Sequence, residues 1–299
     1  MRKKSSFPFT LSLLLLVFPI PFVIGCASSY VAPVAEPQSL TFRDAIGKEH
    51  DFFLDENASY HSYDCSKFSR EGQDKLLYDD DEFVVRHGLD ISRHDGKIDW
   101  KKVKGEGYDF VILRVGYRGY QTGKLKVDEN FHSNIKGAAA AGFDIGVYVF
   151  SQAITTEEAL EEAELVLNEI KNYEISLPVV YDPESIGWDT ARTDGIHPSV
   201  FNENTVVFCE RIREAGYEPM IYANHYWEAF VLDMSMLKKY KFWYADYENS
   251  PQLPYDFEFW QYTAVMPVPG IKRKCDADIW IRRRMEVPAE CDHEIAPNR

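Results

Sequence analysis

Short apolar runs recur along the chain from His87 onward, and segments with helical periodicity separate several of them. Apolar runs of four to eight residues that are bounded by turn residues are typical of buried strands. The pattern predicts eight strands, at residues 87–92, 109–116, 144–150, 177–182, 218–224, 241–246, 258–263 and 276–281.

Three segments between these strands have the period of an amphipathic helix, at residues 130–142, 155–173 and 202–216. Strands that alternate with helices favour a parallel sheet. Eight of them in one region favour a closed α/β barrel over an open nucleotide-binding sheet. Helical patterns nearly vanish after residue 246. We therefore expect an irregular, TIM-like barrel, with helices between its early strands and short loops between its last three.

The N-terminus has the composition of an export signal. Residues 1–4 are basic, and the apolar run at 7–24 contains three prolines, which is typical of a signal peptide and not of a spanning helix. This predicted signal peptide, 1–25, ends in Val-Ile-Gly and is followed by Cys26. The sequence resembles the processing box of bacterial lipoproteins and predicts a lipid anchor at Cys26 that holds the protein on the membrane. The alternative is an ordinary signal peptide with a chance cysteine, and hence a secreted protein.

Composition divides the rest of the chain into four regions. Residues 26–39 are small, polar and proline-bearing, as in a linker. Residues 40–86 are an acidic and aromatic lead-in, with a hairpin expected in 66–80. We expect the lead-in to pack on the barrel, and a flexible stalk is the alternative. The barrel domain is expected at 87–285, and a tail at 286–299.

Charge and motifs exclude several function classes. The net charge of −15 argues against a nucleic-acid partner, because phosphate binding needs clustered lysine and arginine. The chain has no dinucleotide or phosphate-binding glycine motif, no H-E-x-x-H and no G-x-S-x-G, so we expect no cofactor and no catalytic metal. No C-x-x-C occurs either. Cys209 is expected as a buried thiol, and Cys275 with Cys291 is one of several open disulfide pairings.

Acidic residues stand where the predicted strands end or begin: Asp90, Asp182, Glu184, Asp246, Asp276 and Asp278. The C-terminal ends of the strands form the catalytic rim of a parallel barrel. A single acid at a strand end, however, is often only a solvated polar residue. Asp182 and Glu184 are two residues apart, so they project from one face of the strand. Two carboxyl groups in one cleft raise the pKa of one of them, and a glycosidase needs such a protonated acid. Pro183 predicts that the strand ends there.

Four ordered motifs carry a family resemblance. They are GLDISRHDGKIDW at 88–100, DFVILRVGYRG followed by VDENFHSNIKGAAAAGFDIGVYVFSQA at 109–153, LPVVYDPE at 177–184, and FWQYT with VPGIKRKCDAD at 259–278. Together they resemble glycoside hydrolase family 25, the Chalaropsis-type lysozymes. The resemblance covers about residues 87–281 and is specific because both the order and the spacing of the motifs agree.

The resemblance implies a (βα)5β3 barrel that cleaves the β-1,4 bond between N-acetylmuramic acid and N-acetylglucosamine in peptidoglycan. By position, Glu184 matches the general acid/base, Asp182 its partner that orients the 2-acetamido group, and Asp90 a further acid of the cleft. Residues that match substrate-binding positions are Asp276, Tyr148, Gln261, Trp260 and Arg114. For Tyr148, Gln261 and Trp260, the alternative to substrate contact is packing in the core. For Arg114, the alternative is a buried ion pair.

The sequence departs from the family at three places. Pro183 replaces a bulky apolar residue, Asp278 replaces a common asparagine, and the loop at 185–201 is polar and holds Trp188 and His197. This loop is expected either to close over the cleft or to serve only as a connection. The competing functions are a catalytically silent peptidoglycan-binding lipoprotein and a chitinase-like hydrolase, whose longer D-x-x-D-x-D-x-E motif is absent.

Overall fold

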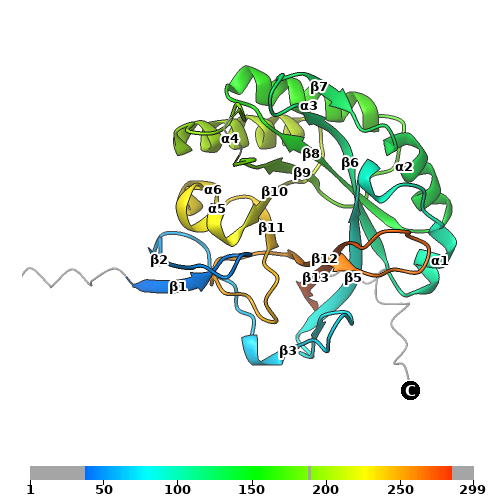
Figure 1. Ribbon diagram of the computed structural model, residues 1–299, viewed down its shortest axis with the longest axis horizontal. Helices are drawn as coiled ribbons and strands as arrows, with labels where there is room; N and C mark the ends of the chain where they lie inside the picture. Colours follow the sequence, from blue (N-terminus) through cyan, green and yellow to red (C-terminus); the bar gives the residue numbers. More distant parts are fainter. Residues whose placement is uncertain (1–37, 188–189, 285–299) are drawn as a thin grey trace, which may run out of the picture. The chain divides into compact units, whose positions relative to one another are not determined.

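The computed structural model describes residues 38–187 and 190–284, and Figure 1 shows the path of the chain. The predicted signal peptide, the predicted lipidation site Cys26, the predicted tail and Cys291 lie outside these residues. Trp188 also lies outside them.

Eight strands form a closed barrel, and each was predicted from the sequence. They are β5 (Phe83–Ile91), β6 (Phe110–Arg118), β8 (Asp144–Ser151), β9 (Val179–Pro183), β10 (Pro219–Asn224), β11 (Lys241–Ala245), β12 (Phe259–Met266) and β13 (Cys275–Arg283). Neighbours in this order are hydrogen bonded, and β13 pairs with β5 to close the ring. The first seven strands run parallel, whereas β13 is antiparallel to β12 and β5.

Two strand features differ from the prediction. β5 begins at Phe83, inside the predicted lead-in, because Phe83–Arg86 pair with the last residues of β13. A short strand, β7 (Leu125–Val127), pairs antiparallel with the C-terminal part of β6.

Helices follow the first five barrel strands, which gives the (βα)5β3 arrangement (Figure 1). They are α1 (Trp100–Gly105), α2 (Phe131–Ala140), α3 (Thr156–Ile170), α4 (Pro198–Glu214), and α5 (His225–Phe230) with α6 (Met234–Leu237). No helix lies between β11 and β13, a stretch that the structure describes throughout. The three predicted helices are α2, α3 and α4. The other three have only four to six residues, which is too short to produce a periodic pattern.

Alternation along the strands divides the core into two layers. Side chains inside the barrel are mainly aromatic or branched: Phe110, Ile112, Tyr148, Val180, Met220, Tyr222, Trp243, Phe259 and Trp280. The opposite faces pack under the helices. There the predicted buried thiol Cys209 is fully buried, as are four apolar residues of α3: Ala159, Ala163, Val166 and Ile170. Arg114, Asp182 and Gln261 come two residues after interior positions. The interior therefore becomes polar at the C-terminal rim.

The lead-in forms two hairpins that contact the barrel. β1 (Ser39–Arg43) pairs with β2 (Glu49–Phe53), and β3 (Phe68–Ser69) pairs with β4 (Leu77–Tyr78) in the segment where a hairpin was expected. The Arg43 backbone exchanges two hydrogen bonds with the Gln252 side chain, of 2.8 and 2.9 Å. The first residue of β1, Ser39, belongs to the predicted linker, so the lead-in begins slightly earlier than predicted.

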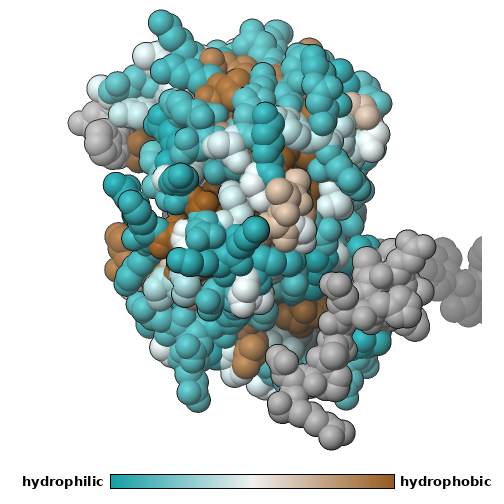
Figure 2. All heavy atoms as spheres, turned by 90° about the vertical axis from the view of Figure 1, so that its right-hand side faces the viewer, coloured by the Kyte–Doolittle hydropathy of each residue, from teal (hydrophilic) through white to brown (hydrophobic). Residues whose placement is uncertain are grey.

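The surface is mostly hydrophilic on the face that carries α1 and α2, at the right of Figure 1. Figure 2 shows this face, where apolar side chains form only small, separate patches. Among the residues that the structure describes, no helix is both long and apolar enough to cross a bilayer.

Glu228 on α5 is a buried acid without a partner. Its side chain is 2% exposed, and neither carboxylate oxygen has a hydrogen-bond partner among the described residues. Burial raises the pKa of Glu228 well above its usual range, and the charge of Asp246 raises it further. The folded protein therefore keeps a proton that the unfolded chain releases, so stability falls as pH rises above the unfolded pKa of about 4.3.

Glu228→Gln is expected to stabilise the protein at pH 7 by about 1–3 kcal/mol, because glutamine keeps the shape of the side chain without titrating. Thermal unfolding of both proteins at pH 4 and pH 7 checks this. The gain in Tm should be present at pH 7 and largely absent at pH 4. An equal gain at both pH values would contradict the burial argument.

Candidate active site

Acids from opposite ends of the chain meet at the C-terminal rim of the barrel. β5 brings Asp90 to this rim. Because β13 runs antiparallel, its first residues lie there too, and Asp276 is the register partner of Asp90. Burial raises the pKa of Asp90 well above its usual range, and the charges of Asp276 and Asp278 add to this. The pKa of Asp276 is raised to about 6 by burial and by Asp95, against the effect of a hydrogen bond with Asp90. The closeness of these two carboxyl groups thus makes the ionised form of Asp90 less favourable.

The predicted pair Asp182 and Glu184 lies at the end of β9, whose last residue is Pro183, as the proline predicted. Asp182 is 5% exposed, and Glu184 is partly buried. Burial raises the pKa of both. The charge of Glu184 adds to the rise for Asp182, while Arg114 opposes it. The pKa of Glu184 reaches about 7 through burial and the charge of Asp276. Glu184 therefore holds its proton up to neutral pH, as a general acid must.

Asp182 also presents an unused acceptor. Its Oδ1 atom is buried and has no hydrogen-bond partner among the described residues. A buried acceptor without a partner is costly and therefore uncommon. This oxygen is therefore available to a hydrogen-bond donor from outside the described residues.

Gln261 connects the acids to two tyrosines. Its Nε2 atom donates to Asp90 Oδ2 at 2.9 Å, and its Oε1 atom accepts from Tyr222 Oη at 3.2 Å and Tyr247 Oη at 3.0 Å. Tyr222 is buried, whereas Tyr247 is 46% exposed. Neither tyrosine was predicted as a site residue. Tyr222 lies in phase with the interior residue Met220, so strand alternation contained its signal, but Tyr247 lies in a loop that has no periodicity.

Tyr148 and Arg114 lie beside these acids. Tyr148 packs edge-on against Trp243, with 5.9 Å between the ring centroids. Burial raises the pKa of the Tyr148 phenol, and the charges of Asp90 and Asp182 raise it further. Arg114 forms a buried ion pair with Asp128, with 2.7 Å between Nη2 and Oδ2. It also lowers the pKa of Asp182. Arg114 is thus both an ion-pair partner and a positive charge next to the cleft.

The prediction that Trp260 contacts substrate is wrong. Trp260 is 0% exposed, its Nε1 atom donates to the Asp246 carbonyl oxygen at 2.8 Å, and its ring packs 5.2 Å from that of Phe68. Adjacent strand residues face opposite sides. The alternation that turns Gln261 toward Asp90 therefore puts Trp260 in the outer layer, under the lead-in.

Asp246 and Asp278 are also held inside the protein. The two carboxylate oxygens of Asp246 accept four hydrogen bonds, from Tyr244, Glu248 and Gln252, so this acid orders the loop after β11. Asp278 is fully buried and accepts from Trp243 Nε1 at 2.8 Å.

Gln152 holds the backbone of Glu184 in place. It is fully buried at the end of β8, and its Nε2 atom donates to the Glu184 carbonyl oxygen. Its Oε1 atom accepts from Thr193 Oγ1 at 3.0 Å. The loop after Glu184 is therefore tied to the barrel, and His197 at its end caps α4 by accepting from Ser199 N.

The site belongs to a known family. Residues 89–271 match the family described as Glycosyl hydrolases family 25. This chain belongs to glycosyl hydrolase family 25. The matched range includes Asp90, Asp182 and Glu184, and it ends just before Asp276. No curated protein sequence matches the chain.

Several solved structures share the fold of this family 25 domain. One is the modular autolysin LytC from Streptococcus pneumoniae in complex with a synthetic peptidoglycan ligand, with 25% identity and a TM-score of 0.60 over 80% of this chain. The chain spans 56% of the length of LytC. A family 25 glycosyl hydrolase from Bacillus anthracis is 20% identical over 71% of this chain and 94% of its own, with a TM-score of 0.57. A bacterial lysozyme from Streptomyces coelicolor is 23% identical over 64% and 90%, with a TM-score of 0.54.

Proposed function

We propose that this family 25 protein is a muramidase that hydrolyses the β-1,4 bond between N-acetylmuramic acid and N-acetylglucosamine in peptidoglycan. The observation that carries the proposal is the pairing of Glu184, whose pKa is raised to about 7, with Asp182, which has a buried and unpartnered oxygen. The peptidoglycan ligand bound by the similar LytC supports the choice of substrate.

In the proposed reaction Glu184 donates its proton to the glycosidic oxygen as the bond to the anomeric carbon breaks. Asp182 accepts a hydrogen bond from the N–H of the 2-acetamido group. This turns the acetamido oxygen toward the anomeric carbon, where it forms a cyclic intermediate. The Glu184 carboxylate then takes a proton from a water molecule, whose oxygen attacks the anomeric carbon. The bond from this carbon to the acetamido oxygen breaks, and the sugar keeps its original configuration. Two displacements at one carbon give retention.

The surrounding side chains bind the sugar and adjust the pKa of Glu184. Asp90, Gln261 and Tyr222 form a connected polar wall, and Tyr247 offers an exposed ring against which a sugar can stack. Asp276 acts through its charge, which helps Glu184 to keep its proton. Peptidoglycan strands are thus the proposed partner, and no cofactor is needed for these steps.

Release of reducing ends from purified peptidoglycan, with chitin oligomers alongside, tests the proposal. We expect rapid release from peptidoglycan and little from chitin. A chitinase-like enzyme would show the reverse preference, and a silent binding protein would bind peptidoglycan without releasing ends.

The rate is expected to fall as pH rises through about 7, because Glu184 then loses the proton that it must donate. In Asp276→Asn the charge that raises the pKa of Glu184 is gone, so the alkaline limb of kcat/KM should move to lower pH. Rates measured from pH 4 to pH 9 for both proteins check this. An alkaline limb that stays in place would show that Asp276 does not act on Glu184.

We also propose that the protein is exported and anchored to the membrane through lipidated Cys26. Cys26→Ala should move the protein from the membrane fraction to the soluble fraction of a bacterial host, because one residue carries the whole anchor. Fractionation and mass measurement of the mature N-terminus test this. Equal distribution of both proteins would favour the simple signal peptide.

A further inference from the structure

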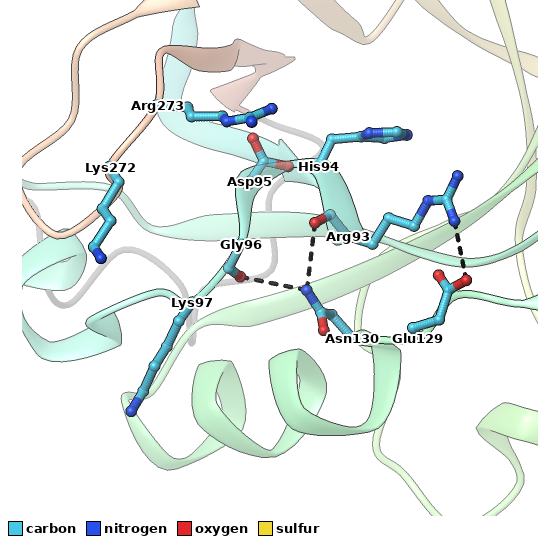
Figure 3. A pocket seen from close by; sticks show the side chains of 9 residues that line it. All are labelled: Arg93, His94, Asp95, Gly96, Lys97, Glu129, Asn130, Lys272 and Arg273. Atoms are coloured by element: carbon cyan, nitrogen blue, oxygen red, sulfur yellow. Dashed lines mark hydrogen bonds and ion pairs between the residues drawn. The ribbon is translucent and has the colours of Figure 1, made fainter.

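A pocket lies beside the strand ends that carry Asp90 and Asp276. It has a volume of about 640 Å³ and lies between the loop after β5 and the loop before β13 (Figure 3). Its lining residues are Arg93, His94, Asp95, Gly96, Lys97, Glu129, Asn130, Lys272 and Arg273. The proposed reaction uses none of them.

The backbone that forms this pocket is anchored on both sides. Ser92 and Asp95 cap the short helical turn after β5 reciprocally, and the Ser92 N–H donates to Asp95 Oδ2 at 2.8 Å. Next to the pocket, the Gly270 carbonyl oxygen accepts from Asp99 N at 2.9 Å, which fastens the loop before β13. Gly270 has a φ of 105°, and a Cβ there would lie 2.8 Å from the Asp99 carbonyl oxygen, so only glycine fits. The two loops that carry the lining residues are therefore held in place.

Three of the cations that line this pocket form no ion pair, although Asp95 and Glu129 line it as well. Lys97, Lys272 and Arg273 are exposed, and none of their side chains forms an ion pair or a hydrogen bond with another described residue. Arg93 differs because it pairs with Glu129 at 3.0 Å, as the dashed line in Figure 3 marks. Burial and the charges of Arg114 and Arg93 lower the pKa of His94, which leaves that ring neutral at pH 7. A cluster of unpaired cations stands out in a chain with a net charge of −15.

The pocket lies near the acids at the rim. Arg273 comes three residues before Asp276, and Asp95 five residues after Asp90. Asp95 is close enough for its charge to raise the pKa of Asp276. A ligand in the pocket would therefore lie close to Asp276, one of the acids at the rim.

We propose that this pocket binds the carboxylates of the stem peptide that the substrate carries on its muramyl lactyl group. This inference rests on the proposed muramidase function. Stem peptides have free carboxylates, which the acidic cleft repels and three unpaired cations attract. The pocket thus gives the enzyme a preference for glycan strands that still carry their peptides.

Equilibrium binding tests the proposal without depending on hydrolysis. The full-length Glu184→Gln protein is titrated with a soluble muropeptide tetrasaccharide and with the same tetrasaccharide after an amidase has removed its peptides. The triple change Lys97→Gln, Lys272→Gln and Arg273→Gln is added to this background. A matched control carries Lys48→Gln, Lys136→Gln and Lys171→Gln, which remove three exposed and unpaired lysines elsewhere on the surface.

The Glu184→Gln protein should bind the peptide-bearing sugar more tightly than the bare one. The pocket variant should lose about tenfold in affinity for the peptide-bearing sugar at low salt, because three weak charge contacts are removed together. The control should keep the original ratio of the two affinities. A ratio that is the same in all three proteins overturns the proposal, as does an equal loss of affinity for both sugars.

Two further arms distinguish a phosphate ligand from a peptide ligand and separate binding from hydrolysis. Soluble glycerol-phosphate oligomers are added as competitors. If they compete strongly and the affinity for the sugar does not depend on the peptide, the pocket binds phosphate polymers and the proposal is overturned. Hydrolysis of peptidoglycan by the wild-type protein is measured in parallel. If the wild type cuts nothing, the muramidase function fails, whereas the peptide dependence of binding still decides whether the pocket acts as proposed.

Discussion

Glu184→Gln is expected to lower the rate of peptidoglycan hydrolysis by about 10²–10⁴-fold, because glutamine has no proton to donate to the leaving oxygen. Binding of the glycan should persist, since the amide keeps the size and polarity of the side chain. The measurement is the release of reducing ends from purified peptidoglycan, together with the affinity for soluble fragments.

Glu248→Gln is the matched control for this variant. Glu248 follows the loop-ordering acid Asp246 near the same rim, but its carboxylate is exposed. We expect the control to hydrolyse peptidoglycan at the wild-type rate. Equal rates for wild type and Glu184→Gln would show that Glu184 is not the general acid, and they would favour the function of a binding protein.

Asp182→Asn is expected to lower kcat by about 10²-fold, which is typical when one group that stabilises the transition state is lost. The carboxylate of Asp182 is buried, and its free Oδ1 atom is the proposed acceptor for the acetamido N–H. An asparagine amide is a weaker acceptor and does not balance the positive charge of the intermediate.

The substrate itself offers a second way to test this role. If Asp182 acts through the acetamido group, the wild type should hydrolyse de-N-acetylated glycan slowly, and the Asn variant should lose little further rate on it. Asp194→Asn, at an exposed acid in the loop that follows Glu184, is the control and should keep wild-type activity. If Asp182→Asn lowered the rate by the full factor of about 10² on both glycans, Asp182 would not act through the acetamido group.

The barrel could be predicted from the sequence because its strands are buried on both faces. Continuous apolar runs therefore mark all eight strands, and long amphipathic helices mark α2, α3 and α4. The β1–β2 hairpin lacked such a signal, since most of its residues are exposed or partly exposed. Helices α1, α5 and α6 are too short for periodicity.

The candidate site was predicted in part. Strand alternation and Pro183 placed Asp182 and Glu184 together at the rim, where the charge of Glu184 raises the pKa of Asp182. The same alternation should have excluded Trp260, because it is adjacent to Gln261. The meeting of Asp90 with Asp276 depends on the antiparallel direction of β13 and the closure of the ring. These long-range pairings leave no local pattern in a sequence.

Mass analysis of fragments released from defined peptidoglycan, after reduction of their new ends, tests the central claim most directly. The method identifies the bond that is cut and the sugar at each new end. We predict fragments that end in reduced N-acetylmuramic acid from the wild type, and almost none from Glu184→Gln. Fragments that end in reduced N-acetylglucosamine, or equal yields from both proteins, would contradict the account.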